Sequence, residues 1–247
     1  MILLIDVGNT RIKWRYLEQE QIFGGGQLAH RGDISQELLN QMWGEIDPPT
    51  AIWAVSVAAS RLSEQICQWS VMRWRLVPNF VAAAKQLGNV INGYREPERL
   101  GSDRWMALVG AGHVAYGACC VADCGTAVTV DCMNANHEHL GGLIFPGLTM
   151  MPRCVSNNTA QVTFTEGNNT LFGRDTSSCL TSGATQSIVS TLQRVADITE
   201  KHLSSPVTRI ITGGDAPHLL PWLGKEWHYE PDLIFFGLAA VIQNNKG

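Results

Sequence analysis

Two short stretches of the sequence join a lone carboxylate to a glycine-containing turn, a combination that can bind phosphate. The first, DVGNTRIK, begins at Asp6 and ends at Lys13. A glycine lets the backbone approach a ligand, so that its N–H groups can donate hydrogen bonds to phosphate oxygens. Asn9 and Thr10 add side-chain donors, Lys13 adds a positive charge, and Asp6 can hold a magnesium ion directly or through water. A nucleoside triphosphate needs these parts, although a plain hairpin with an Asx-type turn has the same composition.

The second stretch, DCGTA, repeats the pattern in the other half of the chain. Asp123 corresponds to Asp6 and Gly125 to Gly8, and each pair follows an apolar strand. An internal repeat of roughly 120 residues predicts two similar units. We therefore expect two α/β domains facing each other across a cleft, one over residues 1–114 and the other over residues 115–247.

A third stretch, LGSDRW, places a carboxylate and a guanidinium group at the start of a predicted helix. Asp103 could accept a proton there, and Arg104 could bind an anionic group with two parallel hydrogen bonds. The helix dipole also favours anions at this end. The structural alternative is a capping Ser102 with Asp103 in the first turn and an exposed Arg104.

The elements that must position these stretches follow from hydrophobic periodicity and from turn residues. We predict strands over residues 2–6, 11–18, 21–30, 51–57, 75–78, 118–125, 126–134, 139–147 and 209–214, and a short one within 226–231. We predict helices over residues 34–46, 60–74, 102–117, 176–203 and 233–245, the third of them capped by its serine.

Composition narrows the function classes. The 247 residues are 45% hydrophobic and carry a net charge of -4, so no basic excess indicates a nucleic-acid partner. We see no signal peptide and no apolar run near the ~20 residues of a membrane span, and we expect a cytoplasmic protein without a membrane partner. Seven cysteines without a C-x-x-C pair favour buried free thiols. The HEH stretch at 137–139 is expected to be a solvated turn.

Taken together, DVGNTRIKW, LGSDRWMALVGA, VADCGTAVTVD, GGLIFPGL and DTSSCLTSG make the chain resemble type III pantothenate kinase. That family belongs to the acetate and sugar kinase, heat-shock protein 70 and actin superfamily. The stretch TGGDA at 212–216 resembles the adenosine motif of this superfamily. The resemblance implies two similar RNase H-like (actin-like ATPase) domains, each a mixed sheet with flanking helices, facing each other across a nucleotide cleft. It also implies ATP-dependent phosphorylation of pantothenate to 4'-phosphopantothenate, the first step of coenzyme A biosynthesis, by a homodimer.

The resemblance further implies roles for matching residues. ATP, with its magnesium ion at Asp6, would be bound by Asp6, Val7, Gly8, Asn9, Thr10, Arg11, Ile12, Lys13 and Thr126. Pantothenate would be bound by Tyr94, Gly101, Ser102, Asp103, Arg104 and Thr176, with Asp103 as the catalytic base. Asp123 would hold a monovalent cation, potassium or ammonium. The match at Thr176 departs from the family, because Asp175 replaces the usual Asn and Cys179-Leu180 replaces Ala-Ile.

Two other functions compete with the kinase. Members of this family have also been described as accessory factors for transcription, and a non-catalytic relative would be expected to lack an acid or the arginine. A phosphohydrolase or a sugar kinase of the same superfamily is the third possibility. The carboxylates and positively charged side chains that the kinase needs are all present, which favours the enzyme. They are Asp6, Lys13, Asp103, Arg104 and Asp123.

Overall fold

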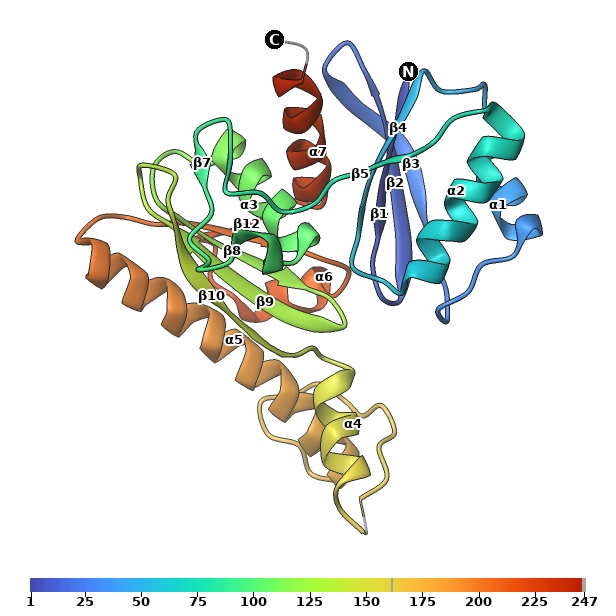
Figure 1. The fold of residues 1–247 in the computed structure, drawn as a ribbon. Coiled ribbons are helices and arrows are strands. Elements are labelled where there is room, and N and C mark those ends of the chain that lie inside the picture. Colours follow the sequence, from blue (N-terminus) through green and yellow to red (C-terminus); the bar gives the residue numbers. More distant parts are fainter. Residues whose placement is uncertain (161, 246–247) are drawn as a thin grey trace. The chain divides into compact units, whose positions relative to one another are not determined.

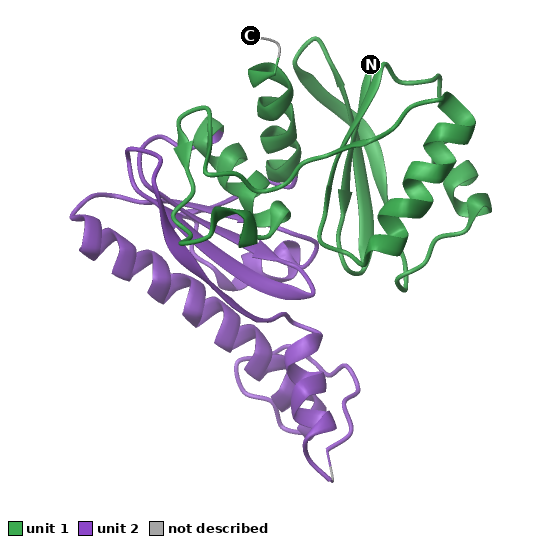
Figure 2. Ribbon diagram, viewed as in Figure 1, with its two compact units in different colours: residues 1–113, 232–247 green, residues 114–231 purple. Residues whose placement is uncertain are grey.

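The computed structural model describes residues 1–160 and 162–245, and the chain divides into two compact units. The first unit is residues 1–113 with 232–247, and the second is residues 114–231 (Figure 2). Each unit is built on one five-stranded mixed sheet with helices beside it, which confirms the predicted α/β class. The first unit includes the last helix, which the division at 114/115 assigns to the second half. That division stays a prediction about domains.

The sheet of the first unit begins with an antiparallel meander. Its strands are β1 (Ile2–Val7), β2 (Arg11–Glu18) and β3 (Gln21–Ala29), as the alternation of the sequence predicts. β4 (Ala51–Ser56) then pairs parallel to β1, and β5 (Asn79–Phe80) pairs parallel to β4. The order β3-β2-β1-β4-β5 places β1, which ends beside Asp6, in the middle of the sheet (Figure 1).

One face of this sheet is covered by α1 (Gln36–Trp43) and α2 (Ser60–Trp74). Apolar side chains recur at helical spacing in both, and their burial against Leu3, Ile5 and Ile12 supplies the main stabilisation of this layer. Four tryptophans in contact extend this core. The ring centroids of Trp14 and Trp43 are 5.9 Å apart, those of Trp43 and Trp69 are 5.8 Å apart, and those of Trp69 and Trp74 are 4.7 Å apart.

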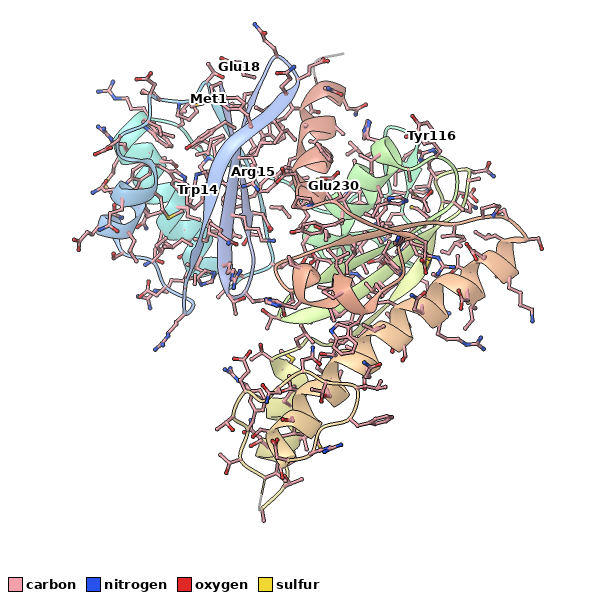
Figure 3. The ribbon with its side chains drawn as sticks, turned by 180° about the vertical axis from the view of Figure 1, so that it is seen from behind. Met1, Trp14, Arg15, Glu18, Tyr116 and Glu230 are labelled. Atoms are coloured by element: carbon pink, nitrogen blue, oxygen red, sulfur yellow. The ribbon has the colours of Figure 1, made fainter. Side chains whose placement is uncertain are left out.

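The strand β2 also serves the opposite face, because successive side chains point to opposite sides of a strand. Figure 3 shows Trp14 on the side of α1 and α2 and its neighbour Arg15 on the side of α7 (Leu233–Asn244). Arg15 Nε lies 2.7 Å from Asp232 Oδ1 at the beginning of α7. α7 packs against β1 and β4, and the first unit also contains α3 (Ser102–Val114) except for its last residue.

The second unit repeats this sheet. β8 (Cys119–Cys124), β9 (Ala127–Met133) and β10 (His139–Pro146) form an antiparallel meander. β11 (Thr208–Thr212) pairs parallel to β8, and β12 (Trp227–Tyr229) pairs parallel to β11. The order β10-β9-β8-β11-β12 matches that of the first unit strand for strand, so the predicted internal repeat is confirmed.

The helices of the second unit are α4 (Met150–Asn157), α5 (Thr176–Leu203) and α6 (Ala216–Leu219), the last followed by a 3-10 turn at Leu220–Trp222. α5 runs for 28 residues, as its periodicity predicts. It buries Ile188, Leu192 and Ala196 in the core of this unit. Arg209 of β11 is tied to α5 by Asp197, 3.0 Å away.

Several local expectations were wrong. No strand forms at 75–78, because Arg75 ends α2 in the left-handed conformation, with φ 58°. The strand comes four residues later as β5. The sequence also gave no signal for α4, for the two-stranded sheet of β6 (Gln86–Leu87) and β7 (Val90–Ile91), or for the 3-10 turn at Pro97–Arg99. α3 ends at Val114 instead of continuing to 117.

All seven cysteines are free, as predicted, but they are not all buried. Cys154 and Cys179 are exposed, which contradicts the expectation for them, and Cys67 is half-buried. The others are buried in β8 and β9: Cys119, Cys120, Cys124 and Cys132. Burial raises the pKa of Cys119 to about 12.

The HEH stretch is only partly the solvated turn expected of it: His137 lies in the turn between β9 and β10 and Glu138 is exposed, but His139 is not solvated. His139 begins β10 and is buried, with Nε2 2.9 Å from Asp131 Oδ1. Among residues 1–160 and 162–245, no helix is both long and apolar enough to cross a membrane.

Candidate active site

The first hairpin (residues 6–13) joins β1 to β2 and holds a buried carboxylate. Asp6 is the last but one residue of β1, is 7% exposed, and lies directly opposite Lys13 of β2. Side chains directly opposite each other on one face of a strand pair are ~4.5–5.5 Å apart at Cβ. The Gly8 N–H donates to the Arg11 carbonyl at 3.0 Å and closes the turn. A carboxylate and an ammonium group therefore share one face beside a tight turn.

The other residues of this hairpin divide by burial. Asn9, Thr10 and Arg11 are exposed at the tip, where their polar groups can reach a ligand. Val7 and Ile12 are fully buried in the core of the first unit. A ligand could meet these two residues only through their backbone.

His30, just after β3, fastens the first hairpin. Its Nε2 lies 2.9 Å from the Gly8 carbonyl, and its backbone N–H donates to the Thr10 carbonyl at 2.9 Å. The Gly32 N–H donates to His30 Nδ1 at 3.0 Å, so Nδ1 carries no proton and Nε2–H is the donor to Gly8. Sequence reasoning missed His30, because no spacing rule connects it with a turn 22 residues earlier.

The second hairpin (residues 123–129) joins β8 to β9 and is one residue tighter. Asp123 is the last but one residue of β8 and lies opposite Thr129. The Gly125 N–H donates to the Ala127 carbonyl at 3.1 Å. Thr126 is exposed at the tip, and its carbonyl accepts a hydrogen bond of 3.0 Å from the Gly147 N–H.

The TGGDA turn (residues 212–216) is seated on the second hairpin. The Asp215 N–H donates to the Cys124 carbonyl at 2.8 Å. Gly213 has φ +95°, and a Cβ there would lie 2.3 Å from the Cys124 carbonyl oxygen and 2.5 Å from Asp123 Oδ1. Only glycine fits that position. The structure thus brings the predicted adenosine motif and Asp123 together in the second unit.

The start of α3 differs from the predicted serine cap. Ser102 is already helical, and its hydroxyl donates to the Ser56 carbonyl of β4 at 3.0 Å. The Trp105 N–H donates to the Gly101 carbonyl at 2.9 Å, which makes Gly101 the cap residue. The hydroxyl of Ser102 thus ties the helix start to the carboxyl end of β4.

Arg104 is buried, so the alternative of an exposed arginine is wrong. The residue is 6% exposed, and its Nη1 donates to the Tyr94 hydroxyl at 2.6 Å. Its guanidinium carbon also lies 5.5 Å from the centre of the Tyr94 ring. Asp103 Oδ1 accepts the Arg104 N–H at 2.7 Å, and a Cβ on Gly101 would lie 2.7 Å from the same oxygen. The structure therefore brings Tyr94, Gly101, Asp103 and Arg104 together.

Asn92 holds the loop that carries Tyr94. The side chain of Asn92 is buried, and its Oδ1 accepts the Tyr94 N–H at 3.0 Å. Its Nδ2 donates to the carbonyls of Ala84 and Pro97, both at 3.0 Å. Sequence reasoning missed Asn92, because a lone asparagine in a loop gives no signal of burial.

Thr176 belongs to the second unit, where it begins α5 and is exposed. Asp175 caps that helix. Its Oδ1 accepts the Ser178 N–H and its Oδ2 accepts the Ser178 hydroxyl, both at 2.8 Å. These bonds, the backbone one first, lower the pKa of Asp175. Because an Asn side chain also offers an acceptor oxygen, the departure from the family's Asn keeps the cap.

No group of three or more His, Cys, Asp or Glu residues within the described ranges could hold a metal ion by itself. The donor chemistry of Asp6 nevertheless fits magnesium. Magnesium in nucleotide enzymes is commonly bound by one or two carboxylates, with phosphates and water as its other ligands. The single buried carboxylate of the first hairpin is such a donor.

Comparison with known proteins agrees with these features. The family model for type III pantothenate kinase matches residues 2–197. A type III pantothenate kinase of Nitrosococcus oceani is 35% identical over 100% of this chain and 95% of its own length. That of Alcanivorax borkumensis is 34% identical over the whole of both chains.

Solved structures share the fold at low identity. A Sinorhizobium meliloti protein described as a 2-dehydro-3-deoxygalactonokinase has a TM-score of 0.61 at 11% identity and covers 98% of this chain and 96% of its own. The activator of 2-hydroxyisocaproyl-CoA dehydratase from Clostridium difficile has a TM-score of 0.54 at 12% identity, with 99% and 96% covered. From its family match and its full-length relatives, the chain belongs to the type III pantothenate kinase family.

Proposed function

We propose that this chain transfers the γ-phosphoryl group of ATP to the primary hydroxyl of pantothenate. The product is 4'-phosphopantothenate, and the reaction is the first step of coenzyme A biosynthesis. Family membership supports the proposal, and the observation that carries it is the group at the start of α3. There Asp103, Arg104 and Tyr94 surround a helix end that favours anions.

Asp103 is the base in this proposal. Its Oδ1 is held by the Arg104 N–H, which fixes the direction of the carboxylate. A general base must approach the hydroxyl to ~2.6–3.2 Å. Arg104 would bind the carboxylate of pantothenate, with Gly101, Ser102 and Tyr94 as neighbours and Thr176 as a further contact. The Tyr94 hydroxyl supports this role, because its bond to Nη1 orients the guanidinium.

ATP binding falls to the hairpins. In the first hairpin, residues 6–13 would contact the phosphates, and Asp6 would fix the magnesium ion that ATP brings. When bound, that ion neutralises the charge that builds up between the phosphates. Lys13, opposite Asp6, supports the proposal because it adds a positive charge on the same face. Thr126, at the tip of the second hairpin, would make a further contact.

Asp123 would hold a potassium or ammonium ion. A carboxylate close to bound phosphates is repelled by them unless a cation lies between. The residue opposite Asp123 is Thr129, whose hydroxyl oxygen is a suitable ligand for such a cation. Activity is therefore expected to need potassium or ammonium.

Assembly and location complete the proposal. We expect the domains to divide near residues 114 and 115 and the chain to form a homodimer, which light scattering after size exclusion tests. Because ATP is available in the cytoplasm, we place the reaction there.

The deciding experiment measures ADP release by the purified chain with pantothenate, with a panel of sugars, and with no acceptor. Release that requires pantothenate supports the proposal. Release with a sugar alone would assign a sugar kinase, and release without any acceptor would assign a phosphohydrolase. A chain with no release under any of these conditions would be a non-catalytic relative, and the proposal would fail.

A further inference from the structure

Helices α3 and α7, both shown in Figure 1, approach each other through two glycines. A Cβ on Gly110 of α3 would lie 2.1 Å from the Leu233 carbonyl oxygen of α7. A Cβ on Gly237 of α7 would lie 2.1 Å from the Met106 carbonyl oxygen of α3. Real Cβ contacts essentially never fall under 3.0 Å. At these two points the backbones are therefore in direct contact.

The backbone conformation does not explain these glycines. Neither Gly110 nor Gly237 has a positive φ, so both adopt helical conformations that any residue can adopt. A glycine inside a helix is less favourable than alanine. What the two positions need is the absence of a side chain.

The crossing connects α3 to the sheet of the first unit. α7 is anchored at its beginning by the 2.7 Å contact between Arg15 and Asp232, and the Arg15 guanidinium lies 5.4 Å from the centre of the Phe235 ring. α7 packs on β1 and β4. α3 is thus held at two places, at its start by the Ser102 bond to β4 and at mid-length by the glycines of the crossing.

We propose that Gly110 and Gly237 are positioning residues, whose crossing sets where Asp103 and Arg104 lie relative to the strand that ends in the first hairpin. The inference rests on the proposed function. Met106 lies three residues after Asp103 on the same helix, so a displacement at Met106 is passed directly to the base. To accommodate a Cβ at either glycine, the distance between that Cβ and the facing carbonyl oxygen must increase from 2.1 Å to at least 3.0 Å, so the two helices must move apart. A misplacement of about 1 Å can lower turnover on the order of 10²-fold.

The test compares Gly110→Ala and Gly237→Ala with Gly183→Ala in the full chain. Gly183 is the matched control, because it lies inside α5 and an added Cβ would meet nothing within 4 Å. We expect kcat to fall by roughly 10- to 100-fold in the two crossing variants. The KM for ATP should stay unchanged in them, since the first hairpin keeps its contacts, and Gly183→Ala should match the parent. Circular dichroism and thermal unfolding report the folded fraction.

Several outcomes would overturn the inference. A Gly237→Ala protein that folds and keeps the parental kcat would contradict it. A loss of activity no larger than the loss of folded protein would contradict it as well. If neither crossing variant folds, Arg15→Lys decides, because it weakens the anchor of α7 without adding an atom at the crossing. A lower kcat with an unchanged KM for ATP is then expected, and an unchanged kcat overturns the inference. A parent without pantothenate-dependent activity refutes the proposed function and this inference with it, whereas an active parent with unaffected variants refutes the crossing alone.

Discussion

The two hairpins share one frame but differ in the residue opposite the carboxylate. In the first hairpin Asp6 faces Lys13, whereas in the second Asp123 faces Thr129. Lysine supplies a permanent positive charge, and threonine supplies only a hydroxyl. The repeated sheet therefore sets where each carboxylate lies, and the opposite strand decides what the carboxylate can do.

The turns differ in the same sense. Residues 8–10 separate β1 from β2, but only residues 125–126 separate β8 from β9. The longer turn is fastened by His30, and the shorter one is covered by the TGGDA turn. A third difference is the Ser-Asp-Arg start of α3 in the first unit. Under the proposed function, proton transfer and magnesium binding fall to the first unit, and binding of the monovalent cation falls to the second.

The largest effect is expected from Asp103→Asn, which tests the role given to the first unit. General-base catalysis is typically worth ~10²–10⁴-fold, so kcat should fall by that order. Asparagine keeps the shape and can still hydrogen-bond the hydroxyl, so pantothenate should bind nearly as well. Steady-state kinetics with calorimetry of pantothenate binding measure both quantities. Arg104→Ala is the reciprocal control, expected mainly to raise the KM for pantothenate. A near-normal kcat in Asp103→Asn would move the base to another residue.

The next effect separates the two aspartates. Asp6→Asn should lower kcat on the order of 10²–10³-fold at every potassium concentration, because it removes a group that fixes charge at the phosphates. Asp123→Asn should instead lower the response to potassium. Rates measured over a grid of magnesium, potassium and sodium concentrations distinguish the two. If both variants gave the same cation profile, the hairpins would not be specialised as proposed.

The sheets and hairpins were predictable because their signals are local. Alternation fixed β2 at residues 11–18, and the repeated Asp-x-Gly turn identified both hairpins from a few adjacent residues. The equal strand order in the two units follows from the same repeat.

The parts that escaped prediction depend on contacts between distant residues. His30 meets Gly8 across 22 residues, and Ser102 bonds to Ser56 instead of capping its own helix. β5 is an edge strand of two residues, too short for a period to appear. Gly110 and Gly237 read as ordinary helix glycines until the two helices are placed side by side.

Exchanging the residue opposite Asp123 tests the same difference between the two hairpins. Thr129→Lys would place an ammonium group opposite Asp123, as Lys13 stands opposite Asp6. The lysine charge should take over part of the role of the bound cation. The rate without potassium, as a fraction of the rate at saturating potassium, should therefore rise several-fold. Thr129→Val is the control that removes the hydroxyl without adding charge. A Thr129→Lys protein that folds and keeps the full potassium requirement would contradict the role given to Asp123.

His30→Ala tests whether fastening the first hairpin matters for ATP. The change removes the side-chain bond to the Gly8 carbonyl in the turn, and with it the Nδ1 acceptor of the Gly32 N–H outside the turn. A single hydrogen bond contributes about 1 kcal/mol, so the KM for ATP should rise by roughly fivefold with little change for pantothenate. Gln27→Ala is a matched control on the same strand pair, since its contact with Arg11 is long, at 3.4 Å, and exposed. An unchanged KM for ATP would leave His30 as a structural residue only.

The smallest effect concerns the cap of α5, where the sequence departs from the family. Because hydrogen bonds from Ser178 lower the pKa of Asp175 in the folded state, the ionised cap stabilises the fold above the ordinary value of 3.8. That contribution is lost as the pH falls through the folded pKa. Asp175→Asn keeps an acceptor for the Ser178 N–H but carries no charge, and the helix dipole favours the negative form near this end.

The parent should therefore unfold about 1–2 °C above Asp175→Asn at neutral pH, and the two melting curves should converge as the pH falls below 3.8. Thermal unfolding between pH 7 and pH 3 measures this difference, and parallel curves over the whole range would contradict it. A second variant of this cap, Asp175→Ala, compared with Asp175→Asn, tests Thr176. If Thr176 contacts pantothenate, Asp175→Ala, which removes the cap, should raise the KM for pantothenate, whereas Asp175→Asn should not. Equal KM values in both variants would show that the order of this helix start does not matter for substrate, and Thr176 would lose its proposed role.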